Sequence, residues 1–327
     1  MAQIAALLRR EKCYRPRRCP PGARYTTPYR FNEEDVKWVA KHFLTETGER
    51  RGGALSYVAD PGFQSGISEE MGIHQTTVSK TVSSVSNKIM KKADLWIKFP
   101  SSTHDIIVTK NEWLQKCKFP SPVGVIDCTH VRIPKPVQFG DEYINRKGFT
   151  STNVQVICNV KEQFTSVEAS WHGSVHVNRI WRNSSVWKVL SECNDTVLLG
   201  DEGYGLEPWL MTPFRNPTED SHKSFNNLLK KERVLIERCF GQLKRRFPVL
   251  QYMCRVAIPN VPTIKACHFI LHNVAKHLQD EDFEDTAQDL HKDGDNEEEK
   301  PLTEADILRR GRQRRQAIAA LIQNAGF

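Results

Sequence analysis

The spacing of apolar residues changes near residue 110, and the change predicts two kinds of structure. In the N-terminal part they recur at helical intervals. Val78, Val82, Val85 and Ile89 form such a stripe, which is typical of a helix packed on one side. Beyond Asn111, short apolar runs of strand length follow one another. We therefore expect an N-terminal all-helical domain followed by an α/β domain with a mixed sheet.

Residues 66–89 have the layout of a helix-turn-helix. A short helical stretch, a tight turn near Gly72 and a longer helix follow one another. Gln75, Thr76 and Lys80 fall at the exposed N-terminal end of the longer helix, where recognition helices contact base edges or phosphates. A small helical bundle that binds only protein fits the same pattern. The sequence leaves both interpretations open.

The α/β part predicts three consecutive strands, a helix, a fourth strand and two more helices. The strands are expected over 122–133, 153–160, 164–171 and 196–201. A helical stretch over 177–193 separates the third strand from the fourth. A long basic helix over 222–247 and an apolar helix over 264–277 follow. This order favours a mixed sheet that is covered on its faces by helices.

Charge is unevenly distributed along the chain. The 327 residues carry a net charge of +8, yet the stretch from Asp280 to Glu299 holds eleven acidic residues and one lysine. Its local charge is −10, so the rest of the chain carries +18. A body that basic is suited to a polyanion such as DNA. The acidic stretch is too poor in apolar residues to pack, so we expect it to be disordered.

These features predict five segments. They are a basic flexible arm over 1–30, a helix-turn-helix DNA-binding domain over 31–100, an α/β domain over 101–279, an acidic disordered linker over 280–300 and a basic C-terminal helix over 301–327. The C-terminal helix carries five arginines between Arg309 and Arg315. Each basic end is a candidate nuclear localisation signal, although the first could equally contact phosphates and the second could be a solvated face.

Cysteine usage and hydropathy bear on the compartment. Nine scattered cysteines form no Cys-x-x-Cys pair and no zinc-binding pattern, which favours a reducing compartment over a disulfide framework. No apolar run approaches the ~20 residues of a membrane span. We expect the nucleus as the main location, with the cytoplasm as a second one, and no membrane association.

Three acidic residues stand out as candidate metal ligands. Asp127 and Asp201 lie at the ends of apolar, strand-like runs, and Glu237 lies on the long basic helix. Phosphodiester cleavage can use two divalent cations that activate the nucleophile and stabilise the leaving oxygen, and Mg²⁺ prefers carboxylate oxygens. Taken singly, each residue could be a turn former or a surface residue. Together they predict a divalent-metal site, because a carboxylate within a buried strand is costly without a partner.

Four further side chains are of types that could act at such a site. His130 and Arg238 are candidates to support the metal ligands or to contact phosphate. His268 and His272 stand four residues apart on an apolar helix, as a metal-binding pair would. Their apolar surroundings favour ordinary packing with satisfied hydrogen bonds.

The three acidic segments, in this order and 74 and 36 residues apart, resemble the DDE transposases of the PIF/Harbinger superfamily and their domesticated nuclease relatives. Further resemblance lies in residues 143–155, 171–174, 179–184, 209–213 and 271–273. The resemblance implies an RNase H-like fold and a nuclease that uses Mg²⁺ or Mn²⁺. It maps the metal-binding catalytic triad onto Asp127, Asp201 and Glu237. It also implies DNA as a partner, together with a Myb/SANT-like DNA-binding protein.

The chain departs from this family at two positions. Val177 follows His176 where relatives usually carry a further Asp, and Asn159 stands where many have an Asp. Valine cannot bind a metal, whereas Asn159 could still offer an oxygen. Three hypotheses follow: an active metal-dependent DNA nuclease, an inactive domesticated descendant that binds DNA or protein in the nucleus, and a helix-turn-helix regulator whose α/β part serves assembly.

Overall fold

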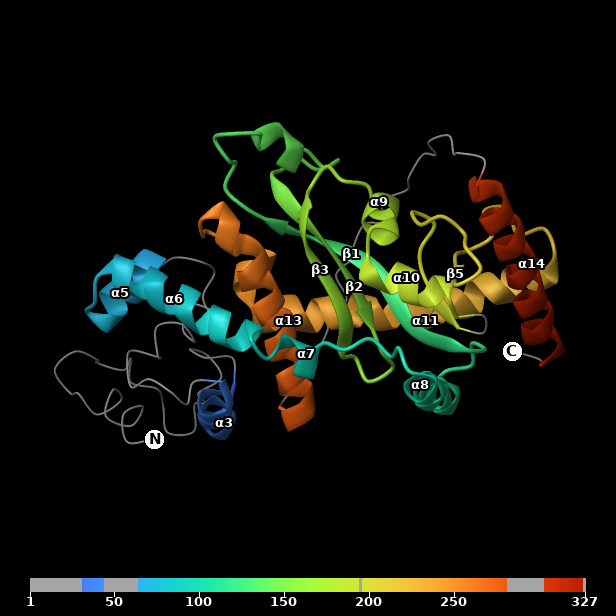
Figure 1. Cartoon of the computed structure of the whole chain (residues 1–327), viewed down its shortest axis with the longest axis horizontal. Coiled ribbons are helices and arrows are strands. Elements are labelled where there is room, and N and C mark those ends of the chain that lie inside the picture. Colours follow the sequence, from blue (N-terminus) through green and yellow to red (C-terminus); the bar gives the residue numbers. More distant parts are fainter. Residues whose placement is uncertain (1–30, 44–63, 194–195, 281–302, 326–327) are drawn as a thin grey trace.

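A five-stranded mixed sheet forms the centre of the protein (Figure 1). The computed structural model describes residues 31–43, 64–193, 196–280 and 303–325. The strand order is β3-β2-β1-β4-β5, with β1, β2 and β3 antiparallel and β4 and β5 parallel to β1. This is an RNase H-like arrangement, as expected. The strands are β1 (Pro122–Arg132), β2 (Ser151–Cys158), β3 (Phe164–His172), β4 (Val197–Leu199) and β5 (Leu210–Met211).

The register of the central strands fixes the places of the acidic residues. Asp127 on β1 pairs with Val156 on β2. On the other side of β1, Val125 lies beside Leu199, the last residue of β4. Two residues beyond this pair stand Asp127 on one strand and Asp201 on the chain that leaves the other. The parallel pairing of β1 and β4 thus brings the two carboxylates to neighbouring positions within the sheet.

Helices cover both faces of the sheet. α9 (Val177–Arg182) and α10 (Ser185–Ser191) lie over one face, with Trp181, Val186 and Leu190 packed against Ile126. The other face packs on α11 (Asp220–Arg246) and α13 (Val261–Leu278). Because alternate side chains of a strand point to opposite faces, β1 contributes Val125 and Val131 to this second core.

The N-terminal part is helical, as the periodicity predicts. It consists of α3 (Glu33–Phe43), α5 (Gln64–Met71), α6 (Gln75–Met90) and α7 (Ala93–Trp96). Gly72 adopts φ +61° between α5 and α6, a left-handed conformation that glycine accepts without strain. The ring of His74 caps α6 by accepting from the amide of Thr76. The buried residues Val78, Val82 and Ile89 hold α6 on the core.

Two elements of the sheet region were not predicted, and the single helix predicted over 177–193 is divided into two. α8 (Thr103–Lys116) packs on β1, and the two-residue β5 closes the sheet edge. The stretch 177–193 forms two helices because the chain turns at Asn183, after which Ser184 caps α10 by accepting from the amide of Trp187. α12 (Pro248–Gln251) and the short turns η1 (Gly140–Tyr143) and η2 (Ile258–Asn260) complete the core.

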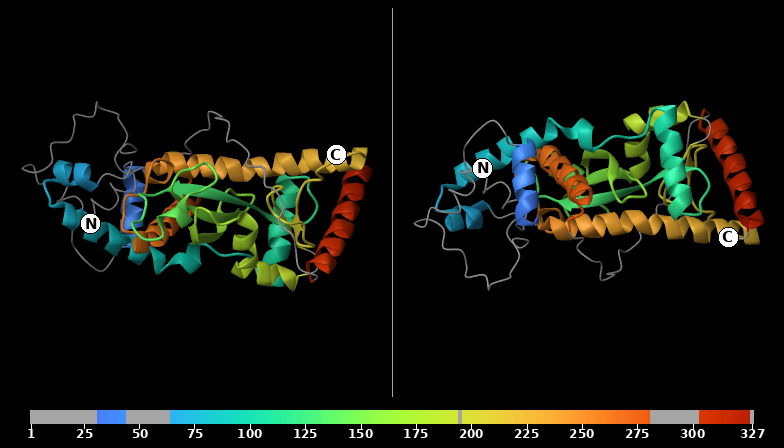
Figure 2. Two further views of the ribbon diagram at one scale, coloured as in Figure 1. Left: turned by 90° about the horizontal axis from the view of Figure 1, so that it is seen from above. Right: turned by 90° about the horizontal axis from the view of Figure 1, so that it is seen from below.

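The two ends of the molecule carry different helices. Figure 2 shows α5 and α6 at one end and α14 (Thr303–Asn324) at the other, with α11 running between them. The predicted basic arm and most of the acidic linker lie outside the described residues. Asp280, which we expected to begin the disordered linker, instead forms a buried ion pair with Arg246 (3.0 Å). Within the described part of the chain, no helix is both long and apolar enough to cross a membrane.

Candidate functional site

Asp127 lies in the middle of β1, with its side chain toward α11. Its Oδ1 accepts a hydrogen bond from the amide of Cys128 (2.7 Å), and its Oδ2 lies 3.4 Å from Arg233 Nη2 on α11. The side chain is 22% exposed. A partly buried carboxylate with one cationic neighbour is thus fixed on the central strand.

Asp201 is held by a tight turn directly after β4. Its Oδ1 accepts from the amide of Gly203 (3.1 Å), and its carbonyl accepts from the amide of Tyr204 (3.3 Å). The next amide, of Gly205, donates to Asn178 Oδ1 on α9 (3.3 Å). These backbone contacts fix the direction in which the Asp201 side chain leaves the sheet.

Glu237 lies on α11, one helical turn after Arg233. Residues four apart on a helix share a face, so Glu237 lies on the side of α11 that brings Arg233 to Asp127. The negative charges of Asp201 and Glu237 both act on Asp127. Asp201 and Glu237 therefore lie within electrostatic reach of Asp127, although the three residues come from three separate elements.

The surroundings of this cluster disfavour the charged forms of Asp127 and Asp201. Burial, followed by the charge of Asp201, raises the pKa of Asp127 to about 7, although Arg233 and the amide of Cys128 act in the opposite direction. Burial also raises the pKa of Asp201, against the opposing effect of Arg233. Carboxyls destabilised in their charged form by burial and by one another are a common feature of functional sites.

The oxygen atoms of the three side chains suit a divalent metal, but the side chains stand too far apart to hold one. Asp127, Asp201 and Glu237 offer the hard oxygen ligands that Mg²⁺ and Mn²⁺ prefer. Within the described ranges, however, no three His, Cys, Asp or Glu side chains stand close enough together to hold a metal ion. The positive charge of Arg233 acts on both Asp127 and Asp201, whereas the carboxyls of Asp201 and Glu237 repel that of Asp127. A cation of two charges would remove that repulsion.

Two basic residues of α11 belong to the same face and were not predicted. Arg233 precedes Glu237 by four residues and Lys244 follows it by seven, so all three share one side of the helix. Burial, together with the charge of Lys147, lowers the pKa of Lys244 to about 8, whereas the charge of Asp127 acts in the opposite direction. Their spacing from Glu237, four residues before it and seven residues after it, is the sequence signal that could have identified Arg233 and Lys244.

A contact between the two acid-bearing segments was also missed. The Tyr204 hydroxyl lies 3.4 Å from Cys128 Sγ, and each residue comes shortly after one of the two aspartates. Tyr204 is buried, and burial raises its pKa well above the usual range. The contact joins β1 to the turn after β4 on the face opposite to Asp127, and so stabilises the relative positions of Asp127 and Asp201.

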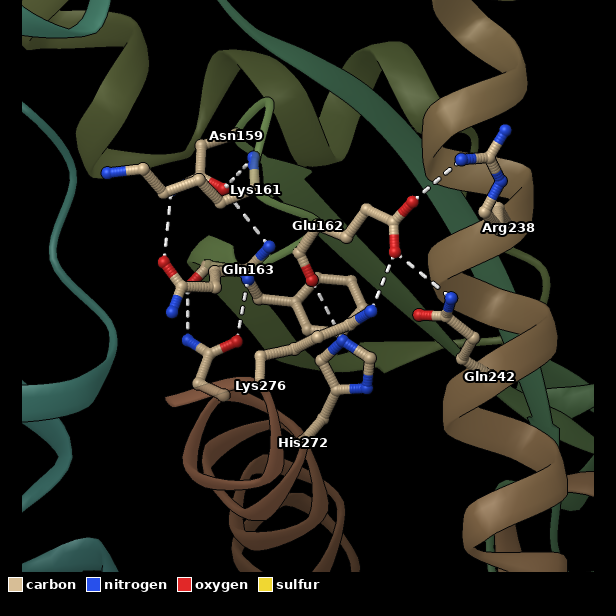
Figure 3. Close-up of polar contacts among 10 residues, drawn as sticks. Asn159, Lys161, Glu162, Gln163, Arg238, Gln242, His272 and Lys276 are labelled. Carbon is tan, nitrogen blue, oxygen red and sulfur yellow. Dashed lines mark hydrogen bonds and ion pairs between the residues drawn. The ribbon is translucent and has the colours of Figure 1, made fainter. Parts of the chain in front are cut away.

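The two supporting candidates lie away from this cluster. His130 bonds through Nδ1 to Ser151 Oγ (3.0 Å), and it stands an odd number of residues from Asp127 on β1, so it points to the other face of the sheet. Arg238 forms an ion pair with Glu162 (2.9 Å) in the turn between β2 and β3, on the side of α11 that faces α13 (Figure 3).

Asn159 has a structural role, which corrects the expectation that it could offer an oxygen to a metal. Its Oδ1 accepts from the amides of Lys161 and Gln163, at 3.0 Å each, and so builds the turn after β2 (Figure 3). Glu162 in that turn adopts φ +60°. It binds Lys276 (2.7 Å) and Gln242 (3.0 Å) as well as Arg238.

Val177 is the first residue of α9 and packs partly buried against the apolar core on that face. Its neighbour Asn178 accepts the Gly205 amide from the turn that holds Asp201. Val177 therefore borders the turn that holds Asp201. In this chain it supplies an apolar contact.

The histidine pair is part of the core, as the packing interpretation predicted. His268 bonds through Nδ1 to the carbonyl of Ile264 (2.5 Å), and His272 bonds through Nε2 to the carbonyl of Glu162 (2.9 Å). Both rings are buried. Burial lowers the pKa of His268 to about 4, so this ring is neutral at physiological pH.

The three predicted DNA-contacting residues lie at the exposed start of α6. Gln75, Thr76 and Lys80 are all exposed, and the Thr76 hydroxyl bonds to the ring of His74 (2.8 Å). The seven cysteines of the described residues are all free thiols.

Comparison with known proteins places these residues in a family context. Residues 126–273 match the family model described as "DDE superfamily endonuclease", and this stretch includes all three acidic residues. The chain is similar to the human protein named "Putative nuclease HARBI1", with 30% identity over 229 residues, 68% of this chain and 65% of that protein.

Two further relatives extend the range of organisms. The mouse protein of the same name is 31% identical over 199 residues, 60% of this chain and 57% of its own length. "Protein ALP1-like" of Arabidopsis thaliana is 25% identical over 239 residues, 67% of this chain and 58% of its own length. The chain thus spans less than two thirds of the length of these relatives. No solved structure matches it.

Proposed function

Because residues 126–273 match the family model described as "DDE superfamily endonuclease", we propose that the protein is a divalent-metal-dependent nuclease that cleaves phosphodiester bonds in DNA through Asp127, Asp201 and Glu237. The observation that carries the proposal is geometric: the parallel strands β1 and β4 bring Asp127 and Asp201 to neighbouring positions, and the contact of Arg233 with Asp127 turns the Glu237 face of α11 toward them. Burial first, and then the charges of Asp201 and Glu237, raise the pKa of Asp127 to about 7. A bound divalent cation would favour the charged forms of these partly buried carboxyls.

Each residue of the site has a role in this proposal. Asp127, Asp201 and Glu237 would hold Mg²⁺ or Mn²⁺. When bound, such an ion lowers the pKa of a water nucleophile and stabilises negative charge on the departing oxygen. Arg233 orients Asp127 from α11. Lys244, on the same face of that helix, would bind a phosphate of the scissile strand. Tyr204 and Cys128 stabilise the spacing between the two aspartates.

DNA would be recruited by the helix-turn-helix. Gln75, Thr76 and Lys80 lie exposed at the start of α6, where a recognition helix contacts the major groove or the phosphates. The net charge of +8 favours association with a polyanion. We include in the proposal a nuclear location, with the cytoplasm second, and a Myb/SANT-like partner that assists DNA binding.

The proposal is tested by nicking of supercoiled plasmid in Mg²⁺ and in Mn²⁺. We expect cleavage by the unaltered protein and a loss of at least ~100-fold in Asp201→Asn and in Glu237→Gln, since each removes a charged ligand. Asp220→Asn is the matched control, because Asp220 is an exposed acidic residue on the same helix as Glu237. Absence of metal-dependent cleavage by pure protein, alone or with the partner, would refute the nuclease.

A second function is favoured by Val177. An apolar side chain packed at the position of a usual acidic residue fits a domesticated descendant that binds DNA or protein in the nucleus without cutting it. In that case the acidic cluster would bind metal weakly, and DNA binding through α6 would persist without nicking. The plasmid assay, paired with a binding assay on the same DNA, separates the two functions.

A further inference from the structure

α14 is fixed to the core by one of its five arginines. Arg315 donates through Nη1 to the carbonyls of Thr212 (3.2 Å) and Pro213 (2.9 Å), and its guanidinium lies 3.9 Å from the ring centre of Phe214. On the same side of the helix, Ile318 and Ile322 are buried. The basic C-terminal segment is therefore a docked helix with a defined inner face.

The upper part of α14 approaches the segment before β5 very closely. A Cβ on Gly311 would lie 3.0 Å from the carbonyl carbon of Glu207, so a larger residue there would require the two segments to move apart slightly. Glu207 is itself buried, with its Oε2 accepting from the indoles of Trp181 (2.9 Å) and Trp187 (3.0 Å). Both walls at this point are consequently held in place.

A half-open cavity of about 270 Å³ lies between α14, the end of α10 and the residues before β5. Its lining includes Ser191, Cys193, Trp209, Arg310, Gln313 and Arg314. Among the described residues that line it, none carries a carboxylate. Two arginines, a glutamine and a tryptophan therefore line one space.

We propose that this cavity binds phosphate groups of the DNA backbone, as a second contact beyond the helix-turn-helix. The inference rests on the proposed function for its choice of DNA as the ligand. Guanidinium groups form paired hydrogen bonds with phosphate oxygens, and a shallow basic cavity suits a continuous backbone. Because α6 and α14 lie at opposite ends of the molecule (Figure 2), DNA held by both would run along the catalytic domain.

The same arginines were candidates for a nuclear import signal, and the structure favours DNA over an import receptor. Arg315 is occupied by two backbone carbonyls, and Arg310 and Arg314 belong to a helix docked on the core. The segment does not present its five arginines as one free basic peptide.

The test measures DNA affinity of the full chain at a series of salt concentrations, in EDTA so that no cleavage occurs. We expect Arg310→Gln with Arg314→Gln to make the slope of log K against log salt shallower by ~1 to 2, because each lost phosphate contact removes about 0.9 from the slope of a duplex. Lys223→Gln is the matched control, since Lys223 is exposed on α11 and pairs with Asp220. Arg310→Gln alone is the second variant, should the double variant melt at a lower temperature.

An unchanged slope in variants that remain folded would overturn the proposal. If the variants lose nuclear accumulation while the slope is unchanged, the arginines belong to an import signal instead. If inorganic phosphate stabilises the unaltered protein against unfolding while the slope is unchanged, the cavity binds a free anion. The measurement does not depend on catalysis. A protein that fails to nick plasmid but loses slope in the variants would retain the cavity as a DNA contact and lose the proposed nuclease.

Discussion

Arg233 Nη2 on α11 lies 3.4 Å from Asp127 Oδ2 on β1, so a positive charge lies beside one of the candidate metal ligands. Arg233 opposes the rise in pKa of both Asp127 and Asp201. It therefore keeps two buried carboxyls closer to their charged, metal-binding forms. The contact also fixes the face of α11, and hence of Glu237, toward the sheet.

Replacement of Arg233 should shift the pH profile of cleavage. In Arg233→Gln the pKa values of the two aspartates rise further, so we expect the midpoint of the rate against pH to move up by ~1 unit, which corresponds to ~1.4 kcal/mol. Arg238→Gln is the matched control, because Arg238 pairs with Glu162 on another side of the same helix. Equal profiles for the two variants would show that Arg233 does not act on the site.

Asp127 should make the metal-free protein less stable as the pH rises. Its pKa in the folded protein is about 7, above the ~3.9 of an unfolded chain. Between these values the folded state binds more protons than the unfolded state, so the free energy of unfolding falls as pH increases through this window. We expect a loss of ~1–3 kcal/mol between pH 4 and pH 8, and a smaller loss in Asp127→Asn.

Urea unfolding in EDTA at these two pH values measures the effect. A loss of the same size in the variant would show that other groups cause it. Added Mn²⁺ should restore stability at pH 8 in the unaltered protein and have less effect in Asp127→Asn, since a ligand that binds the folded state stabilises it.

Val177→Asp should strengthen metal binding. The side chain borders the turn that holds Asp201, and at the first position of α9 a carboxylate is favoured by the helix dipole. We expect the Mn²⁺ concentration for half-maximal nicking to fall several-fold, at a cost of ~1 kcal/mol in stability from the lost apolar contact. Val177→Asn is the control without charge, and a similar gain in both variants would exclude a new metal ligand.

Glu162 should stabilise the packing of α11 and α13 on the β2–β3 turn. Its burial raises its pKa, but hydrogen bonds from Lys276, Gln242 and Arg238 outweigh this and bring it to about 2. Its stabilising contribution is thus present above ~4.3, the value of an unfolded chain, and is lost as the pH falls toward 2. We expect Glu162→Gln to lose ~1–3 kcal/mol at pH 7, because it removes the negative charge that pairs with Lys276 in a partly buried site.

Glu112→Gln provides the comparison. Glu112 pairs with Lys161 at 2.6 Å, but the lysine side chain is 53% exposed, so this change should lose ~1 kcal/mol or less. Denaturant unfolding at pH 7 and pH 3 measures both variants. A loss in Glu162→Gln that is as large at pH 3 as at pH 7 would contradict the pKa assignment.

The order of the large elements could be predicted because their apolar residues repeat at clear intervals. The stripe of Val78, Val82 and Ile89 predicted α6, and the apolar run before Asp127 predicted β1. β5 could not be predicted, because two residues are too few to show alternation. Its position depends on pairing with β4, a contact between segments that no local pattern contains.

The supporting residues of the site could not be predicted from adjacency in sequence. Arg238 follows Glu237 directly, yet one helical step turns its side chain ~100° away, toward Glu162. Arg233 stands four residues earlier and shares the face of Glu237. Similarly, His130 lies three residues from Asp127, and the alternation of a strand places it on the other face.

Iron-directed self-cleavage tests whether Asp127, Asp201 and Glu237 form one metal site. Fe²⁺ in place of Mg²⁺, with ascorbate and peroxide, cuts the backbone near its own binding position. We predict cuts close to residues 127, 201 and 237, suppressed by excess Mn²⁺ and absent in Asp127→Asn. Cuts confined to other segments, or an unchanged pattern in the variant, would show that the three acidic residues do not share a metal.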